Sequence, residues 1–348
     1  MTSFTKKILI LIFALVIIFY PTIVKAQSNS EEGQVTKIIE QNGNYQKLEL
    51  KAKSGIKVIE SGQYETSNNI KYKVGDNVVI TDDQITDFVR RPHLYLLFFI
   101  FIILTILIAG KWGATSIIGM GYSFYIIFRF ILPLIIKGYD PVIVSIIGAM
   151  FIIPVTFSLS HGINRKTMNA IFGTLISMLV VGILSMIFVD LSKLTGFAVE
   201  EAGFLQYQLG GIINMKGILL AGIIISTLGV MDDITISQAS VVEELKKANP
   251  KLTNKELFMR SMNVGRDHIS SMVNTLVLVY AGASLPLLLL FVNNPHPFSE
   301  VINYEIIADE IVRTLVGSIG LILAVPITTY IAVNSYNKQL TTSIKNKI

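Results

Sequence analysis

The chain has 348 residues, of which 52% are hydrophobic and 15% are charged, and its mean hydropathy is +0.61. Soluble domains carry about 25% charged residues, so this composition excludes an ordinary soluble enzyme. The absence of cysteine excludes disulfides, cysteine-based zinc sites and thiol catalysis. The four histidines lack metal-site spacing, so we expect no metal and no cofactor. The net charge of +5 is small and lies in short loops, which is typical of membrane orientation rather than nucleic-acid binding.

The chain begins with a segment typical of secretion or membrane insertion. Lys6 and Lys7 precede seventeen uncharged residues, 8–24. A basic start followed by an apolar stretch describes both a cleaved signal peptide and a retained signal anchor. Residues 24–26 fit the small-residue cleavage pattern only loosely, which slightly favours an anchor over residues 1–26. Either alternative places the following segment outside the cytoplasm.

Residues 27–92 differ in composition from the rest of the chain, with 19 charged residues among 66. Hydrophobic and charged residues alternate over 46–53, which predicts a strand with one solvated face. Short apolar runs at 56–59, 70–74 and 78–81 are separated by turn residues. We therefore expect a small extracytoplasmic β-domain of four or five strands, such as a small OB-like or SH3-like barrel.

The rest of the chain is dominated by long apolar stretches. A stretch of about 20 such residues crosses the roughly 30 Å of a bilayer core. Together with the first segment, the sequence predicts an all-α polytopic membrane bundle of about eight transmembrane helices. The seven later spans lie near 94–110, 114–136, 141–160, 168–189, 212–230, 269–292 and 310–333, within a transmembrane domain of residues 93–337.

The distribution of basic residues predicts the orientation. If the first segment is retained, fourteen basic residues lie on the cytoplasmic side, including six between Lys246 and Arg266. The short outside loops after the second span carry only Lys137 and Lys193. Since basic loops stay inside, we expect both termini, the loop 231–268 and the tail 338–348 to be cytoplasmic. The membrane is predicted to be the bacterial cell membrane.

The most informative polar residues follow the span 212–230. Asp232 and Asp233 continue without a helix breaker to Asn249, and Asp233 shares a helical stripe with Ser237. The two acids are either solvated at the cytoplasmic surface or, for one of them, turned into the bundle. A carboxylate inside a membrane protein is a functional hypothesis by default. In the second case, one acid would couple a proton or cation to transport.

A second helix is expected after this stretch. Residues 253–256 match a capping box, and we expect the helix to run to about Asn263 and to break at Gly265. Arg266 and Asp267 then form a local ion pair or anchor the next span, or Arg266 reaches back to Asp232 or Asp233.

Three further polar residues fall within predicted spans. Asn274 and Thr275 lie about two turns into their span, so we expect them to face other helices and to form hydrogen bonds there. Arg129 lies among apolar residues; it either extends outward to the membrane surface or pairs with Asp190 or Glu310.

The run from Gly229 to Leu290 resembles the YibE/F-like family of bacterial multispanning membrane proteins. The residues that carry the resemblance read GVMDDITIS, EEL, NP, LF, SMNVGRD and MVNTLVLVYAGASLPLLLL, and 311–326 adds to it. The resemblance implies an integral membrane protein and by itself implies no activity. The order of elements is also similar, more faintly, to SecD/SecF-type permeases, which is an analogy of fold only.

We therefore expect a transporter, permease or export factor, with proton or cation coupling and an unknown substrate. The alternative is a scaffold or assembly factor that binds protein partners, or a second copy of itself, through the β-domain and cytoplasmic helices. An enzyme is not expected, since the sequence has no P-loop, no dinucleotide fingerprint and no HExxH motif. Beyond the lipid bilayer, no partner is specified, and nucleic acid is not expected.

Overall fold

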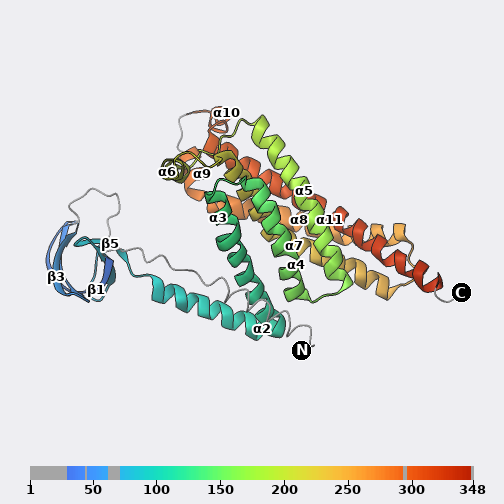
Figure 1. Ribbon diagram of the computed structural model, residues 1–348, viewed down its shortest axis with the longest axis horizontal. Coiled ribbons are helices and arrows are strands. Elements are labelled where there is room, and N and C mark those ends of the chain that lie inside the picture. The colour runs from blue at the N-terminus through green and yellow to red at the C-terminus, as the bar shows by residue number, and fades with distance from the viewer. Residues whose placement is uncertain (1–29, 44, 62–70, 293–295, 346–348) are drawn as a thin grey trace. The chain divides into compact units, whose positions relative to one another are not determined.

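The computed structural model describes residues 30–43, 45–61, 71–292 and 296–345 (Figure 1). The expected signal segment, residues 1–26, lies outside the described residues. The chain divides into two compact units, residues 1–101 and residues 102–348.

The first unit contains a five-stranded antiparallel sheet. Its strands are β1 (Ser30–Asn42), β2 (Tyr45–Ala52), β3 (Gly55–Ser61), β4 (Asn77–Thr81) and β5 (Gln84–Phe88), in the order β3-β2-β1-β4-β5. Along β2 the side chains of Gln46, Leu48 and Leu50 are buried at every second position, as a strand with one solvated face requires. The expectation of a small β-domain is confirmed.

The sheet curls so that its two end strands, β3 and β5, contact each other. Lys57 of β3 holds the curl: its Nζ lies 2.7 Å from Glu31 of β1 and 2.8 Å from Asp83, in the turn between β4 and β5. The curl encloses a core of seven buried hydrophobic residues, Val35, Leu48, Leu50, Ile59, Tyr72, Val78 and Ile80.

The strand expected over 70–74 is absent from its described part, residues 71–74. The reason is a side chain that takes the place of a neighbouring strand. Gln46 accepts a hydrogen bond from the Tyr72 backbone N–H at 2.7 Å and donates one to the Tyr72 carbonyl at 3.0 Å. These two bonds satisfy the backbone of Tyr72 without a strand partner.

A long apolar helix, α2 (Arg91–Ile126), follows the sheet in sequence, with a kink at Gly110. Gly110 has φ +58°, a conformation that glycine adopts at little cost. The π-helical turn η1 (Ile127–Ile131) and the short helix α3 (Leu132–Ile136) continue it. The kink falls where the sequence predicts one span to end and the next to begin.

The second unit is a bundle of long helices (Figure 1). The main ones are α4 (Pro141–His161), α5 (Arg165–Leu191), α7 (Met215–Ala248), α8 (Asn254–Ala283) and α11 (Glu305–Lys345). Helices α5, α7 and α11 pack on one another, α4 packs on α5 and α7, and α8 packs on α7 and α11. Short helices α6 (Glu200–Gln208), α9 (Leu285–Val292) and α10 (Phe298–Val301) lie in the connections. We call the end where α5 stops and α7 and α11 start the α10 end.

The bundle helices are hydrophobic on their outward faces as well as inside. Phe151 on α4, and Phe172, Leu179 and Ile183 on α5, are each about half exposed or more. Helices that are apolar all round are typical of a bundle surrounded by lipid. In the part of the chain that the structure describes, five helical stretches are long and apolar enough to cross a membrane: 91–136, 141–161, 165–191, 215–248 and 305–336.

The predicted count of eight spans is not confirmed by these five. One predicted span lies outside the described residues, and two share the 46-residue stretch 91–136. At 1.5 Å per residue that stretch is about 69 Å long, more than twice the thickness of a bilayer core. The predicted span 269–292 is divided between α8 and α9 and is not among the five.

Gly265 does not break its helix, contrary to the sequence-based expectation. Helix α8 begins at the capping box of Thr253 and Glu256, as predicted, and continues through Gly265 to Ala283. Gly265 is buried, and a Cβ there would lie 2.5 Å from Val325 of α11 and 3.1 Å from Gln238 of α7. The glycine therefore allows three helices to approach closely, as small residues do in membrane bundles.

Candidate functional site

Polar side chains line the interface of α5, α7, α8 and α11. Thr174 of α5 and Thr235 of α7 are fully buried, with their hydroxyl oxygens 2.8 Å apart. Each hydroxyl oxygen also lies 3.0 Å from the carbonyl oxygen four residues earlier in its own helix. Since a hydroxyl has one proton, one of the two donates to the other, which in turn donates to its own helix. Buried threonines are tolerated in apolar helices because they can use these backbone carbonyls.

Gln238 joins three helices. Its side-chain amide nitrogen donates to the Ser261 carbonyl of α8 at 3.0 Å and to the Thr329 hydroxyl of α11 at 2.7 Å. Asn169 of α5 donates to Ser335 of α11 at 2.9 Å. We call these bonded residues the polar core: Asn169, Thr174, Thr235, Gln238, Ser261, Thr329 and Ser335.

The register of the polar core places the helix ends. The bonds Thr174–Thr235 and Asn169–Ser335 set the start of α5 level with the later parts of α7 and α11. The bond from Gln238 to Ser261 places the start of α8 at the same level. The polar core therefore lies toward the end opposite the α10 end.

Asp232 and Asp233 differ sharply in their surroundings. Asp233 is exposed, whereas Asp232 is half-buried. The Asp232 Oδ1 atom is buried and forms no hydrogen bond with any residue that the structure describes. Asp232 lies one turn before Thr235, whose hydroxyl approaches the Asp232 backbone carbonyl at 3.3 Å. The structure thus distinguishes two acids that the sequence left equivalent.

The other residues of this loop region lie outside the polar core. Ser237 is half-buried on the stripe that contains Asp233. Arg266 and Asp267 are exposed, and Arg266 donates to Asn263 at 3.2 Å. The ion pairs between described residues include none between Arg266 and Asp267, Asp232 or Asp233. The expected roles of Arg266 as a local partner or as a counter-ion are therefore not seen.

Asn274 and Thr275 do not face other helices, so that prediction is wrong. Both are exposed, and the Thr275 hydroxyl donates to the Ser271 carbonyl of its own helix at 3.1 Å. The buried stripe of α8 consists of Leu257, Ser261, Gly265 and Leu276. Asn274 lies two residues before Leu276, about 160° away around the helix.

Arg129 lies exposed in the π-helical turn η1. Its two proposed partners have other cations beside them. Asp190 pairs with Lys216 of α7, and the Glu310 carboxylate lies 3.5 Å from Arg313. The arrangement fits the alternative in which Arg129 extends outward.

Sequence reasoning missed a second group of charged residues, at the α10 end. Glu305 accepts hydrogen bonds from the Thr195 hydroxyl at 2.7 Å and from the Gly196 N–H at 3.1 Å. One turn later, Asp309 is only 7% exposed. The polar core was missed as well, although Thr174 and Thr329 stand among apolar residues of predicted spans. The argument made for Asn274, that a polar residue within a span faces other helices, applies equally to these threonines and would have identified them.

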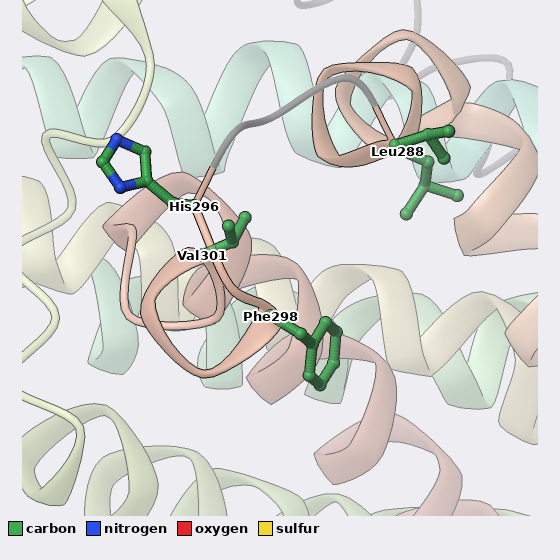
Figure 2. A pocket seen from close by; sticks show the side chains of 5 residues that line it. Leu288, His296, Phe298 and Val301 are labelled. Atoms are coloured by element: carbon green, nitrogen blue, oxygen red, sulfur yellow. The ribbon is translucent and has the colours of Figure 1, made fainter.

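A pocket of about 380 Å³ lies at the α10 end, lined by Leu288, Val292, His296, Phe298 and Val301. Figure 2 labels Leu288 of α9, Phe298 and Val301 of α10, and His296, which precedes α10. The Nδ1 atom of His296 lies 3.0 Å from the Oε2 atom of Glu300. The other lining residues are apolar. Asp232 lies 17 residues after the start of α7, about 26 Å along the helix from this end, so the pocket is separate from the polar core.

The chain is mostly helical, with several apolar helices that could span a membrane, a buried polar core and a partly buried carboxylate. The family described as YibE/F-like protein matches residues 97–338, and the chain belongs to this family. The match begins after the β-domain, and the fainter likeness to SecD/SecF-type permeases is not shown. No curated protein and no solved structure matches the chain.

Proposed function

We propose that this protein is a membrane transporter or export factor coupled to protons, with Asp232 as the coupling carboxylate. The observation that carries the proposal is the buried Oδ1 atom of Asp232, which has no hydrogen-bond partner among the described residues. Intramembrane carboxylates are rare and mark ion or substrate pathways.

The chemistry of a buried carboxylate supports a proton as the coupling ion. An ionised carboxylate is costly to bury without a partner, whereas the neutral acid is far less so. A change of surroundings can therefore make Asp232 bind or release a proton. Among the described residues, no three His, Asp or Glu side chains gather as a metal site would require. A proton needs only one carboxylate, so it fits this site better than a multiply coordinated cation.

The distribution of charge supports an orientation for this proposal. The end opposite the α10 end carries Arg165 and Lys166 before α5, and Lys246, Lys247 and Lys251 around the end of α7. Following the positive-inside rule, this end is cytoplasmic. With the bundle in the bacterial cell membrane, Asp232 then lies in its cytoplasmic half. The β-domain is extracytoplasmic.

The alternative is a scaffold that transports nothing and has no enzymatic role. One observation favours it: the exposed side of α8 carries Arg266, Asp267, Asn274 and Thr275. Polar groups on a lipid-facing helix are stabilised when another protein covers them. A protein partner or a second copy would meet this requirement.

Adjacent residues provide a matched test. In a deletion strain with a growth or export phenotype, Asp232→Asn should abolish complementation while protein abundance is unchanged. Asp233→Asn, a change of the same kind at an exposed position, should complement as the wild type does. Asparagine keeps the shape of aspartate and removes its titration. If Asp232→Asn also complements fully, Asp232 carries no proton and the scaffold alternative replaces the proposal.

A further inference from the structure

A second carboxylate is buried in the same bundle, at the α10 end. Asp309 of α11 is 7% exposed, and its Oδ1 atom forms no hydrogen bond with any described residue. One turn later on the same helix, the Arg313 Nε is also buried without a hydrogen-bond partner in the described structure. An acceptor and a donor are thus both unsatisfied at positions i and i+4, which face the same side of a helix.

The neighbouring charged groups are already engaged. Glu305 is hydrogen-bonded to Thr195 and Gly196, and Glu310 has Arg313 at 3.5 Å. From the helices packed on α11, Asp190 of α5 and Lys216 of α7 pair with each other. The second half of α8, from Ile269 onward, has no charged residue. Arg313 is therefore the cation best placed to pair with an ionised Asp309.

We propose that Asp309 is a second proton-binding carboxylate of the same route, and that Arg313 exchanges between Glu310 and Asp309 as Asp309 loses and gains its proton. The structure corresponds to the state in which Asp309 holds the proton and Arg313 pairs with Glu310. When Asp309 gives its proton to water, the new carboxylate accepts a hydrogen bond from Arg313, and the half-exposed Glu310 is left to solvent. The inference rests on the proposed function.

The two carboxylates lie on helices that run in the same direction. A Cβ on Gly317 of α11 would lie 3.4 Å from the Thr227 hydroxyl of α7, so these two residues are level. Asp309 is eight residues before Gly317, about 12 Å toward the α10 end, and Asp232 is five residues after Thr227, about 8 Å the other way. The two acids are therefore separated by roughly 20 Å along the bundle.

Hydroxyl groups occupy part of this interval. Ser318 and Thr227 are buried, and each donates to a carbonyl of its own helix, at 2.8 Å and 2.7 Å. Tyr280 of α8 reaches Ser226 of α7 at 3.4 Å. Hydroxyls both donate and accept hydrogen bonds, so these side chains can hold water in a route between Asp309 and Asp232. Asp309 would be the extracytoplasmic port and Asp232 the cytoplasmic one.

Chemical labelling tests Asp309 without a known substrate. The full chain is reconstituted in vesicles and treated with dicyclohexylcarbodiimide, which modifies protonated carboxyl groups in apolar surroundings, and peptides are analysed by mass spectrometry. Asp309 should be labelled at neutral pH, where an exposed aspartate is ionised and does not react. Asp140 is the control: it is exposed and caps α4, so it should remain unlabelled.

Two variants test the role of Arg313. Arg313→Gln removes the cation that favours the carboxylate, so the half-maximal pH for labelling of Asp309 should rise by about one unit or more. Arg313→Lys keeps the charge and should restore most of the wild-type value. An Asp309 that is unlabelled in the wild type at neutral pH overturns the site. An unchanged midpoint in Arg313→Gln overturns the exchange. Because labelling of Asp309 is read separately from complementation by Asp232→Asn, failure here is distinct from failure of the proposed function.

Discussion

At the scale of single residues, the ion pair of Lys57 with Glu31 makes the stability of the β-domain depend on pH. Lys57 bridges Glu31 and Asp83, and the hydrogen bond from Lys57, aided by Ser54, lowers the pKa of Glu31 from 4.5 to about 2. A carboxyl with a lowered pKa in the folded state stabilises it above its unfolded pKa. This stabilisation is present above about pH 4.5 and is lost as the pH falls toward about 2.

Glu31→Gln should therefore weaken the sheet at neutral pH and make no difference near pH 2. Hydrogen–deuterium exchange of β1 and β3 amides, measured in the full chain at matched pH, would show faster exchange in the variant only at the higher pH. Glu40→Gln is the control, because Glu40 is an exposed carboxylate on the same strand. A difference between Glu31→Gln and the wild type that persists unchanged at low pH would contradict the assigned role.

The carboxylates also show what the sequence could and could not specify at this scale. It identified Asp232 and Asp233 as a pair, but adjacent residues point about 100° apart on a helix. Which of them turns inward depends on the rotation of α7 against its neighbours, and that is a tertiary property. The burial of Asp309 likewise depends on the rotation of α11 against its neighbours, and the structure places Arg313 beside Glu310.

At the scale of secondary structure, the local signals for helix ends predicted those ends correctly. Gly265, in contrast, did not mark the end of a helix. The capping box of Thr253 and Glu256 and the end of α7 at Asn249 depend on nearby backbone geometry, and both are as predicted. The sequence predicts a helix break at Gly265, since glycine weakens an isolated helix. In the bundle, the close packing of Val325 and Gln238 against Gly265 outweighs that local preference. The same rotation of α8 that buries Gly265 turns Asn274 outward.

The observed rotation of α8 predicts different changes in stability for two similar substitutions. Gln238→Leu removes the hydrogen bonds to Ser261 and Thr329 and should lower the free energy of unfolding by about 1 kcal/mol. Asn274→Leu removes an exposed amide from the opposite face of α8 and should leave it nearly unchanged. Thermal unfolding of the purified protein in detergent measures both. Equal losses for the two variants would mean that α8 packs through a different face.

At the scale of the whole chain, the register of the polar core gives the basic-residue pattern a structural basis. Arg165 and Lys166 at the start of α5 lie at the same end as the connection from α7 to α8, because Thr174 bonds to Thr235 and Gln238 to Ser261. Sequence alone supplied the charges and their order. That these charges lie at the same end of the bundle follows from helix packing, which depends on contacts between residues distant in sequence.

Cysteine labelling tests the proposed orientation of the chain in the membrane. Because the chain has no cysteine, single cysteines can be placed without any background. With the basic end inside, Lys53→Cys in the β-domain and Glu200→Cys at the start of α6 should react with an impermeant thiol reagent in intact cells. Asn249→Cys, between α7 and α8, should react only after the cells are permeabilised. All three positions are exposed, so a difference in reactivity reports the side of the membrane rather than burial. Labelling of Asn249→Cys but not Glu200→Cys in intact cells would reverse the orientation and would exchange the sides assigned to Asp232 and Asp309.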